Sequence, residues 1–211
     1  MKKLALFDVD FTLTKKETLI AFYAYLVKKK PALLRHLPRA IGSGLLYQLG
    51  INKEKRTKEL FLAFLKDLPM KTVDKLTDDF IEDELKHFLY EDGIEKVKEL
   101  KEKGYTIVLT SASPEFYILK LKEVFDADYV MGTRFLVKDG NFASIMDGEN
   151  NKGAEKVRRL FEIFDKETID FEDSYMFSDS MSDEPLLALM GKPYLINYKK
   201  KNPKYPVLYW R

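Results

Sequence analysis

The chain has 211 residues, of which 45% are apolar, so it can bury a sizeable core as one domain or as a core with one insertion. Its 36 basic and 34 acidic residues leave a net charge of +2, which gives no reason to expect nucleic acid as a partner. Cysteine is absent, which excludes disulfides and thiolate chemistry. We expect a soluble, cytoplasmic protein with no membrane partner.

The first predicted element is a strand. Residues 3–7 (KLALF) form a short apolar run that is typical of a buried parallel strand. Asp8 and Asp10 follow at its carboxyl end. Because unpaired buried charges are costly, these two carboxylates require a partner or a function.

Residues 15–90 contain helical patterns, including 17–29 and 56–68, and no convincing strand. A helical block between the first two strands predicts an inserted cap domain, with an internal turn at 67–71. Residues 25–50 mix leucine, tyrosine and basic side chains, and the basic residues interrupt the apolar run too often for it to span a bilayer. This segment could lie on an anionic surface, but we prefer a pair of cap helices whose lysine stems cover apolar surface.

Helical and strand patterns alternate after the cap. Helices are predicted at 93–104 and 152–164, and strands at 105–110, 174–179 and 193–197. A separate hairpin is predicted at 132–148, around the turn signal Asp139-Gly140. The alternation predicts an α/β fold with a parallel sheet, built from residues 1–14 and 91–211.

Polar side chains gather at the predicted carboxyl ends of the strands, where ligands bind in open α/β sheets. The residues expected there are Asp8, Asp10, Thr12, Ser111, Ala112, Ser113, Lys152, Asp179 and Asp183. Converging carboxylates repel one another unless a cation joins them, and oxygen ligands without histidine or cysteine favour Mg²⁺. A metal beside a lysine, hydroxyls and N–H groups indicates phosphoryl chemistry, in which a carboxylate can serve as the nucleophile.

Four motifs resemble those of haloacid dehalogenase (HAD) superfamily phosphatases, specifically the phosphoserine-phosphatase-like branch (subfamily IB type) with a helical cap. They are DVDFT from Asp8 to Thr12, IVLTS ending at Ser111, ENNKG with Lys152, and DSMSD from Asp179 to Asp183. The resemblance extends over essentially the whole chain. It implies a Rossmann-like core with an inserted helical cap (C1 type), and a Mg²⁺-dependent phosphatase that hydrolyses a small phosphomonoester through an aspartyl-phosphate.

The resemblance also implies a role for each carboxylate. Asp8 would be the nucleophile and would bind Mg²⁺ through one oxygen. Asp10 would protonate the leaving oxygen and then activate water, while its backbone carbonyl binds the metal. Asp179 would bind Mg²⁺ directly, and Asp183 would orient a metal-bound water. Asp183 could also serve as a simple N-cap of the following helix, which is compatible with that role.

Phosphate and substrate contacts follow from the same resemblance. Ser111, the N–H of Ala112 and Lys152 would hold the phosphate. Glu17 stands nine residues after the nucleophile, where phosphoserine phosphatases carry a glutamate that meets the substrate's ammonium. An alternative is that Glu17 interacts with the dipole of the helix that begins there. Ser113, which precedes a proline, is expected to cap the next helix.

Several positions depart from the phosphoserine phosphatase pattern. Phe61 stands where those enzymes carry an arginine for the substrate carboxylate, and Arg56 is the nearest arginine upstream. Ser182 replaces an asparagine before the last aspartate, and the chain has Ser-Ala-Ser at 111–113 where those enzymes have Ser-Gly-Gly. We therefore expect a sibling subfamily, with phosphoserine or a phosphorylated amino alcohol as candidate substrates.

Three alternatives belong to other functional classes. A phosphotransferase on the same scaffold would pass the phosphoryl group to an alcohol. A receiver-type signalling domain also forms an aspartyl-phosphate. It has no cap, however, and its phosphoacceptor lies on a central strand, whereas here Asp8 and Asp10 follow the first strand and the helical block precedes the second. A non-catalytic protein that binds a phosphorylated ligand would need none of the catalytic side chains present here.

Overall fold

The computed structural model describes residues 1–201 and 203–211. Its main sheet has six strands in the order β3-β2-β1-β6-β7-β8, and the pairings among them are parallel. These strands are β1 (Leu4–Asp8), β2 (Thr106–Pro114), β3 (Tyr129–Thr133), β6 (Tyr175–Ser178), β7 (Lys192–Ile196) and β8 (Val207–Leu208). All five residues of β1 are buried, as expected for a central strand that is covered on both faces.

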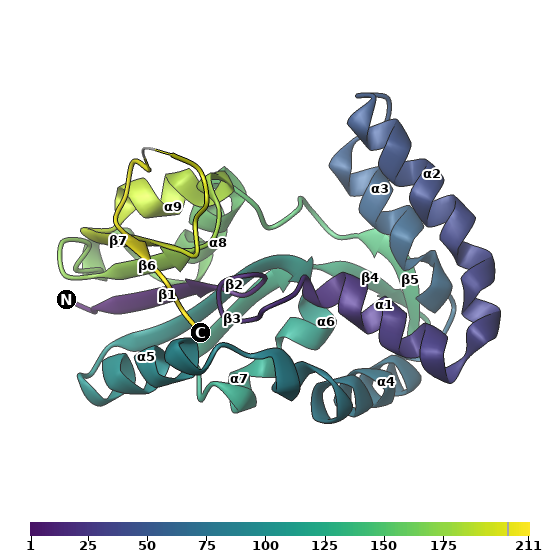
Figure 1. The fold of residues 1–211 in the computed structure, drawn as a ribbon, viewed down its shortest axis with the longest axis horizontal. Coiled ribbons are helices and arrows are strands. Elements are labelled where there is room, and N and C mark those ends of the chain that lie inside the picture. Colours follow the sequence, from purple (N-terminus) through teal and green to yellow (C-terminus); the bar gives the residue numbers. More distant parts are fainter. Residues whose placement is uncertain (202) are drawn as a thin grey trace.

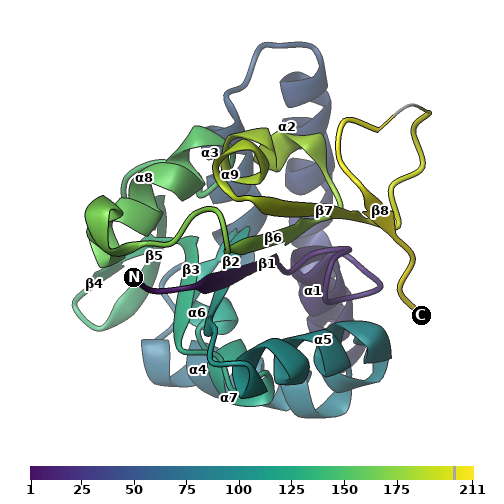
Figure 2. The same cartoon turned by 90° about the vertical axis from the view of Figure 1, so that its left-hand side faces the viewer.

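Helices cover both faces of this sheet (Figure 2). One face carries α8 (Ala154–Ile163) and α9 (Glu184–Leu189), and the other carries α5 (Glu91–Glu102), α6 (Glu115–Ile118) and α7 (Leu121–Val124). Short 3₁₀ turns lie at Lys166–Thr168 and Met181–Asp183. The predicted α/β fold with a parallel sheet is confirmed.

The four strands predicted for the sheet are present as β1, β2, β6 and β7, whereas β3 and β8 were not predicted. β8 has only two residues, which is too short to show a periodic pattern. β3 contains Gly132 and runs almost directly into the hairpin, so its short apolar run was not separable from that segment.

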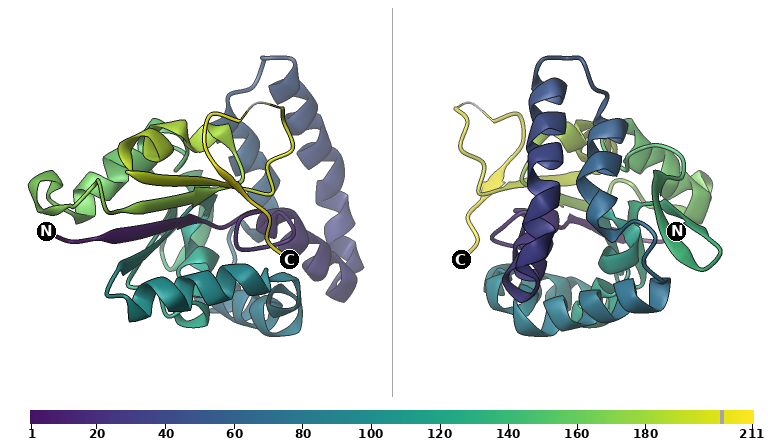
Figure 3. Two further views of the ribbon diagram at one scale, coloured as in Figure 1. Left: turned by 60° about the vertical axis from the view of Figure 1, so that its left-hand side comes forward. Right: turned by 90° about the vertical axis from the view of Figure 1, so that its right-hand side faces the viewer.

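Residues 18–88 form helices and, in the part of the chain that the structure describes, no strand. They comprise α1 (Thr18–Lys29), a 3₁₀ helix (Pro31–His36), α2 (Leu37–Gln48), α3 (Glu54–Phe61), a 3₁₀ helix (Leu62–Leu65), α4 (Met70–Asp83) and a 3₁₀ helix (Leu85–Phe88). The pair α2 and α3 stands away from the sheet (Figures 1 and 3). No helix among the described residues combines the length and the apolar character needed to cross a membrane.

The chain leaves the core and returns to it at adjacent points. Thr14 pairs with Leu89, and the N–H of Tyr90 donates to the carbonyl of Leu13 at 2.9 Å. Phe22 of α1 also packs against Tyr117 of α6, with ring centroids 5.9 Å apart. These contacts agree with an insertion after the first strand, and the division into a core and a cap over 15–90 stays a prediction.

The hairpin predicted around Asp139-Gly140 is present. It consists of β4 (Phe135–Lys138) and β5 (Asn141–Met146), which pair antiparallel in a separate two-stranded sheet. Both turn residues have positive φ, 49° and 77°, which a two-residue turn of type I′ requires. The hairpin is attached to the helical insertion because Phe142 and Leu68 share a backbone hydrogen bond of 2.9 Å.

Candidate active site

The strands β1, β2 and β6 run toward the side of the molecule that carries α1 and α3 (Figure 1). Because parallel strands place their carboxyl ends at one edge of the sheet, the residues that end these strands meet there. The sequence predicted this gathering, and the structure gives the individual contacts.

Asp8 is the last residue of β1 and is almost completely buried. Its Oδ1 accepts a hydrogen bond from Nζ of Lys156 at 2.8 Å, and the same ammonium donates to Oδ2 of Asp183 at 2.7 Å. Burial lowers the pKa of Lys156, but the attraction of Asp183 and Asp8 outweighs burial and raises it. Lys156 is therefore a fully buried cation that bridges two carboxylates.

Lys152, which we expected at the phosphate, does not contact Asp8. Its side chain is 41% exposed and lies on the rim of the cavity, where Nζ is 3.2 Å from Oε1 of Glu54. Lys152 precedes α8, whereas Lys156 lies in the first turn of this helix. Side chains in a helix point back toward its N-terminus, which here faces the strand ends, so Lys156 can reach Asp8. The sequence held one signal for Lys156: it is a lysine on the apolar face of an amphipathic helix.

Asp10 is held by three hydroxyl groups. Thr18 donates to Oδ1 from both its N–H and its Oγ1, at 2.7 and 2.6 Å, while Ser113 and Ser111 donate to Oδ2 at 2.7 and 3.0 Å. The prediction that Ser113 caps the next helix is wrong, because Pro114 is the N-cap of α6 and Ser113 points to Asp10 instead. Neither Thr18 nor Ser113 was predicted in this network.

The remaining carboxylates complete an oxygen-only donor set. Asp8, Asp10, Asp179 and Asp183 line one cavity, and burial together with the neighbouring carboxylates raises the pKa of Asp8 and brings that of Asp179 to about 6. The buried Oδ1 of Asp183 has no hydrogen-bond partner among the described residues, and its side chain does not cap α9. This donor chemistry fits a hard cation such as Mg²⁺, although no group of three such side chains in the described residues is already arranged as a complete metal site.

This carboxylate cavity has a volume of about 290 Å³ and is closed on one side by the helical insertion. It is lined by Asp8, Asp10, Phe11, Glu17, Glu54, Lys58, Ala112, Ser113, Lys152, Lys156, Asp179, Ser182 and Asp183. Glu17 is the N-cap of α1, since its Oε2 accepts from the N–H of Ile20 at 2.7 Å. Burial, together with the nearby Asp10, raises the pKa of Glu17 to about 7. Glu17 therefore both caps the helix and faces the cavity.

Lys58 of α3 is a second basic residue in the cavity that sequence reasoning missed. Its Nζ donates to the carbonyl of Ala112 at 2.6 Å and to Oδ1 of Asn150 at 2.7 Å. Burial lowers the pKa of Lys58 to about 8. Arg56 does not line the cavity: it is exposed and lies 3.6 Å from Glu59. The chain gave no signal for Lys58 beyond its place on the predicted cap helix.

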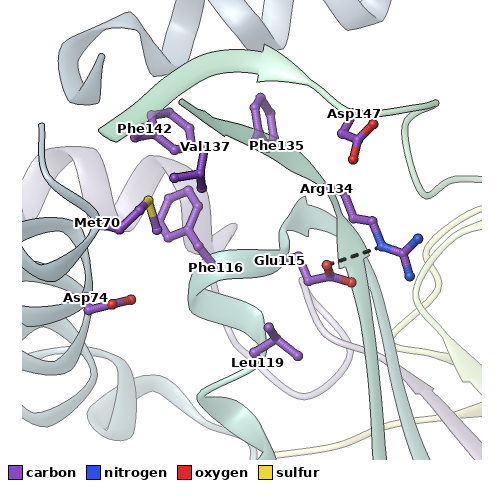
Figure 4. Close-up of a pocket in the computed structure, with 10 residues that line it drawn as sticks. All are labelled: Met70, Asp74, Glu115, Phe116, Leu119, Arg134, Phe135, Val137, Phe142 and Asp147. Carbon is purple, nitrogen blue, oxygen red and sulfur yellow. Dashed lines mark ion pairs between the residues drawn. The ribbon is translucent and has the colours of Figure 1, made fainter. Parts of the chain in front are cut away.

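A separate cavity of about 340 Å³ lies between α4, α6 and the β4-β5 hairpin (Figure 4). Three phenylalanines and four charged residues are among its lining, and Arg134 is paired with Glu115 at 3.5 Å. It shares no residue with the carboxylate cavity. The chemistry predicted from the sequence therefore belongs to the smaller cavity.

Comparison with known proteins gives the class. Residues 5–188 match the family model of haloacid dehalogenase-like hydrolases, and the chain belongs to this family. It is 28% identical over 191 residues to the phosphoserine phosphatase of Methanocaldococcus jannaschii, covering 90% of this chain and 83% of the relative.

Solved structures agree with this assignment. A phospho-aspartyl intermediate analogue of phosphoserine phosphatase has a TM-score of 0.63 and 28% identity, covering 94% of this chain and 88% of that one. A protein of unknown function from Bordetella pertussis shares the fold, with a TM-score of 0.87 at 21% identity over 99% of this chain and 98% of that one. The predicted resemblance is confirmed: the chain is a phosphoserine-phosphatase-like phosphatase of the HAD superfamily.

Proposed function

We propose that the enzyme hydrolyses a small-molecule phosphomonoester through an aspartyl-phosphate on Asp8, with Mg²⁺ as cofactor. The observation that carries this proposal is the position of Asp8: it ends the central strand, faces the cavity, and is bonded to the buried ammonium of Lys156. The comparison with a phosphoserine phosphatase intermediate supports the same chemistry.

Asp8 and Asp10 would have different roles in the reaction. Asp8 would attack phosphorus, so that a new O–P bond forms as the ester O–P bond breaks. Asp10 would donate a proton to the leaving oxygen and then take a proton from the water that hydrolyses the aspartyl-phosphate. Hydrogen bonds from Thr18, Ser111 and Ser113 fix the orientation of the Asp10 side chain. They hold it as an accepting carboxylate, which supports the second half of this role, in which Asp10 takes the proton from water.

The phosphate would be held by the N–H of Ala112. Ser111, which we expected to hold it as well, is fully buried, donates to Asp10 and accepts from the N–H of Ser113, so we assign it the role of supporting the loop. We assign the lysine role to Lys156 in place of Lys152, because Lys156 contacts the nucleophile. Mg²⁺ would be held by Asp8, the backbone carbonyl of Asp10, and Asp179, with Asp183 behind them, and would neutralise charge on the transferring phosphoryl group.

Glu17 and Lys58 would meet the rest of the substrate. They face the cavity with opposite charge, so an ester that carries an ammonium group, such as phosphoserine or a phosphorylated amino alcohol, would contact Glu17. A carboxylate on the same ester would contact Lys58, which compensates for the missing cap arginine at Phe61. The cytoplasmic location expected from the sequence stays a prediction.

Phosphate release across a panel of esters tests this proposal. The panel contains phosphoserine, phosphoethanolamine, phosphocholine, sugar phosphates and nucleotides, and the matched variants are Glu17→Gln and Lys58→Met. We expect phosphoserine or phosphoethanolamine to give the highest kcat/KM. Lys58→Met should impair phosphoserine and spare phosphoethanolamine, which lacks the carboxylate. A sugar phosphate or nucleotide as the best substrate, unaffected by either variant, would refute the assignment of these two contacts.

A further inference from the structure

Exposed apolar side chains concentrate on the outer part of the α2-α3 pair. Of the sixteen large hydrophobic residues that are exposed in the structure, seven lie between residues 34 and 51. They are Leu34, Ile41, Leu45, Leu46, Tyr47, Leu49 and Ile51. Exposed apolar side chains that concentrate in one part of a fold often mark an interaction site.

The geometry of α2 explains this exposure. Its inner face packs on α3 through Ser43, which is buried and whose carbonyl accepts a hydrogen bond from Thr57. Ile41, Leu45 and Leu49 follow one another at intervals of four residues and lie on the opposite side of the helix. They are 54%, 56% and 73% exposed. The outer face of α2 is therefore apolar and, in the described chain, is not covered by another element.

The segment that carries this face is basic. Residues 18–53 contain six lysines and arginines and no aspartate or glutamate, although the whole chain has 34 acidic residues. Lys28 and Lys29 are paired with Glu84 and Asp83 of the neighbouring α4 region, at 2.8 Å each. Nζ of Lys29 also lies 4.5 Å from the ring centroid of Tyr25, so these two lysines lie at the end of α1 and leave the exposed face of α2 uncovered. Arg39 is exposed, and none of the ion pairs among the described residues involves it.

We propose that the α2 patch, made of Leu34, Ile41, Leu45, Leu49 and Ile51 with Arg35 and Arg39, docks on an anionic lipid bilayer, contrary to the expectation from the sequence that the chain has no membrane partner. A helix of twelve residues is too short to span a bilayer, and the apolar stripe of α2 with Arg39 beside it would suit a helix that lies in the interface. A second copy of the chain is a poorer occupant, because a two-fold contact through this face would bring the arginines of both copies together. An anionic bilayer instead offers acyl chains to the apolar residues of the patch and negative headgroups to Arg35 and Arg39.

Vesicle flotation tests this proposal. The full chain is mixed with vesicles of equimolar phosphatidylcholine and phosphatidylglycerol, or of phosphatidylcholine alone. We expect flotation with the anionic vesicles, weakened by high salt, and little with the neutral ones. Arg39→Gln should weaken binding by about fivefold, and Leu49→Ser by about tenfold.

Tyr209→Ser is the matched control, because Tyr209 is 74% exposed but lies outside the patch. The oligomeric state of each variant is measured by light scattering, and release of phosphate from a soluble ester shows that Leu49→Ser is folded. Absence of flotation with anionic vesicles, or equal loss in Tyr209→Ser and Leu49→Ser, would overturn the proposal. So would a dimer that Leu49→Ser dissociates without vesicle binding, which would assign the patch to a second copy.

Discussion

Replacing Lys156 by methionine should both destabilise and inactivate the enzyme, whereas the same change at Lys152 should do neither. Methionine keeps most of the length and volume of the lysine stem and removes only the charge. In Lys156→Met, the buried carboxylates of Asp8 and Asp183 lose the ammonium that lies 2.8 and 2.7 Å from them. In Lys152→Met, an exposed ion pair with Glu54 is lost.

The magnitudes follow from burial. Removing one partner of a buried ion pair leaves an uncompensated charge and costs about 3–5 kcal/mol of unfolding free energy. For a chain of 211 residues this corresponds to a fall in Tm of about 6–20 °C. The exposed pair of Lys152 contributes about 0–1 kcal/mol, so Lys152→Met should change Tm by at most a few degrees, on the order of 2–4 °C.

Thermal unfolding in EDTA measures stability, so that a bound metal cannot replace the lost charge. Phosphate release with Mg²⁺, at a temperature where both variants are folded, measures activity. We expect Lys156→Met to lose activity by a factor of at least about 10² and Lys152→Met by less than about fivefold. The reverse order, with Lys152→Met inactive and Lys156→Met active and stable, would refute the assignment of the lysine.

Two further predictions concern contacts of the site, and a third concerns the packing of β3 against α6. Thr18→Val removes the hydroxyl that donates to Asp10 and should lower kcat by about 5- to 30-fold, while Thr18→Ser restores it; equal rates in the two variants would contradict the role of this hydroxyl. The pKa of Lys58 is lowered to about 8, so its positive charge is lost as pH rises through that value. In the wild type, kcat/KM for phosphoserine should therefore fall above pH 8. In Lys58→Met, kcat/KM should be low at every pH and should show no such fall. Gly132→Ala should destabilise the chain by about 1–3 kcal/mol in urea unfolding, because its Cβ would lie 2.7 Å from the Cα of Glu115; an unchanged unfolding midpoint would show that the backbone can give way.

The sequence was sufficient to predict the parallel sheet, the helical segment between its first two strands and the gathering of carboxylates at the strand ends, because these depend on local patterns. The apolar runs before Asp8 and Ser111 are continuous, and the Asp139-Gly140 turn has the residues that its backbone demands. β8 could not be predicted, since two residues carry no period and its pairing with β7 is a tertiary contact.

The contacts inside the site were less predictable for a related reason. Lys152 and Lys156 differ by about one helical turn, and only the packing of α8 decides which one reaches Asp8. Thr18 and Lys58 lie 8 and 48 residues after Asp10 along the chain and meet Asp10 and the cavity only because the insertion folds back toward the strand ends. A resemblance transfers a motif, but the side chain that performs a role is set by three-dimensional packing.

The most direct test of the central claim is phosphate release from the best ester by the wild type and by Asp8→Asn, each with Mg²⁺ and with EDTA. The exchange keeps the shape of residue 8 and removes the carboxylate that we propose as the nucleophile. We predict release by the wild type with Mg²⁺ and none above background in the other three conditions, with Asp8→Asn still folded by circular dichroism. Release by Asp8→Asn at the wild-type rate, or undiminished release in EDTA, would contradict the account.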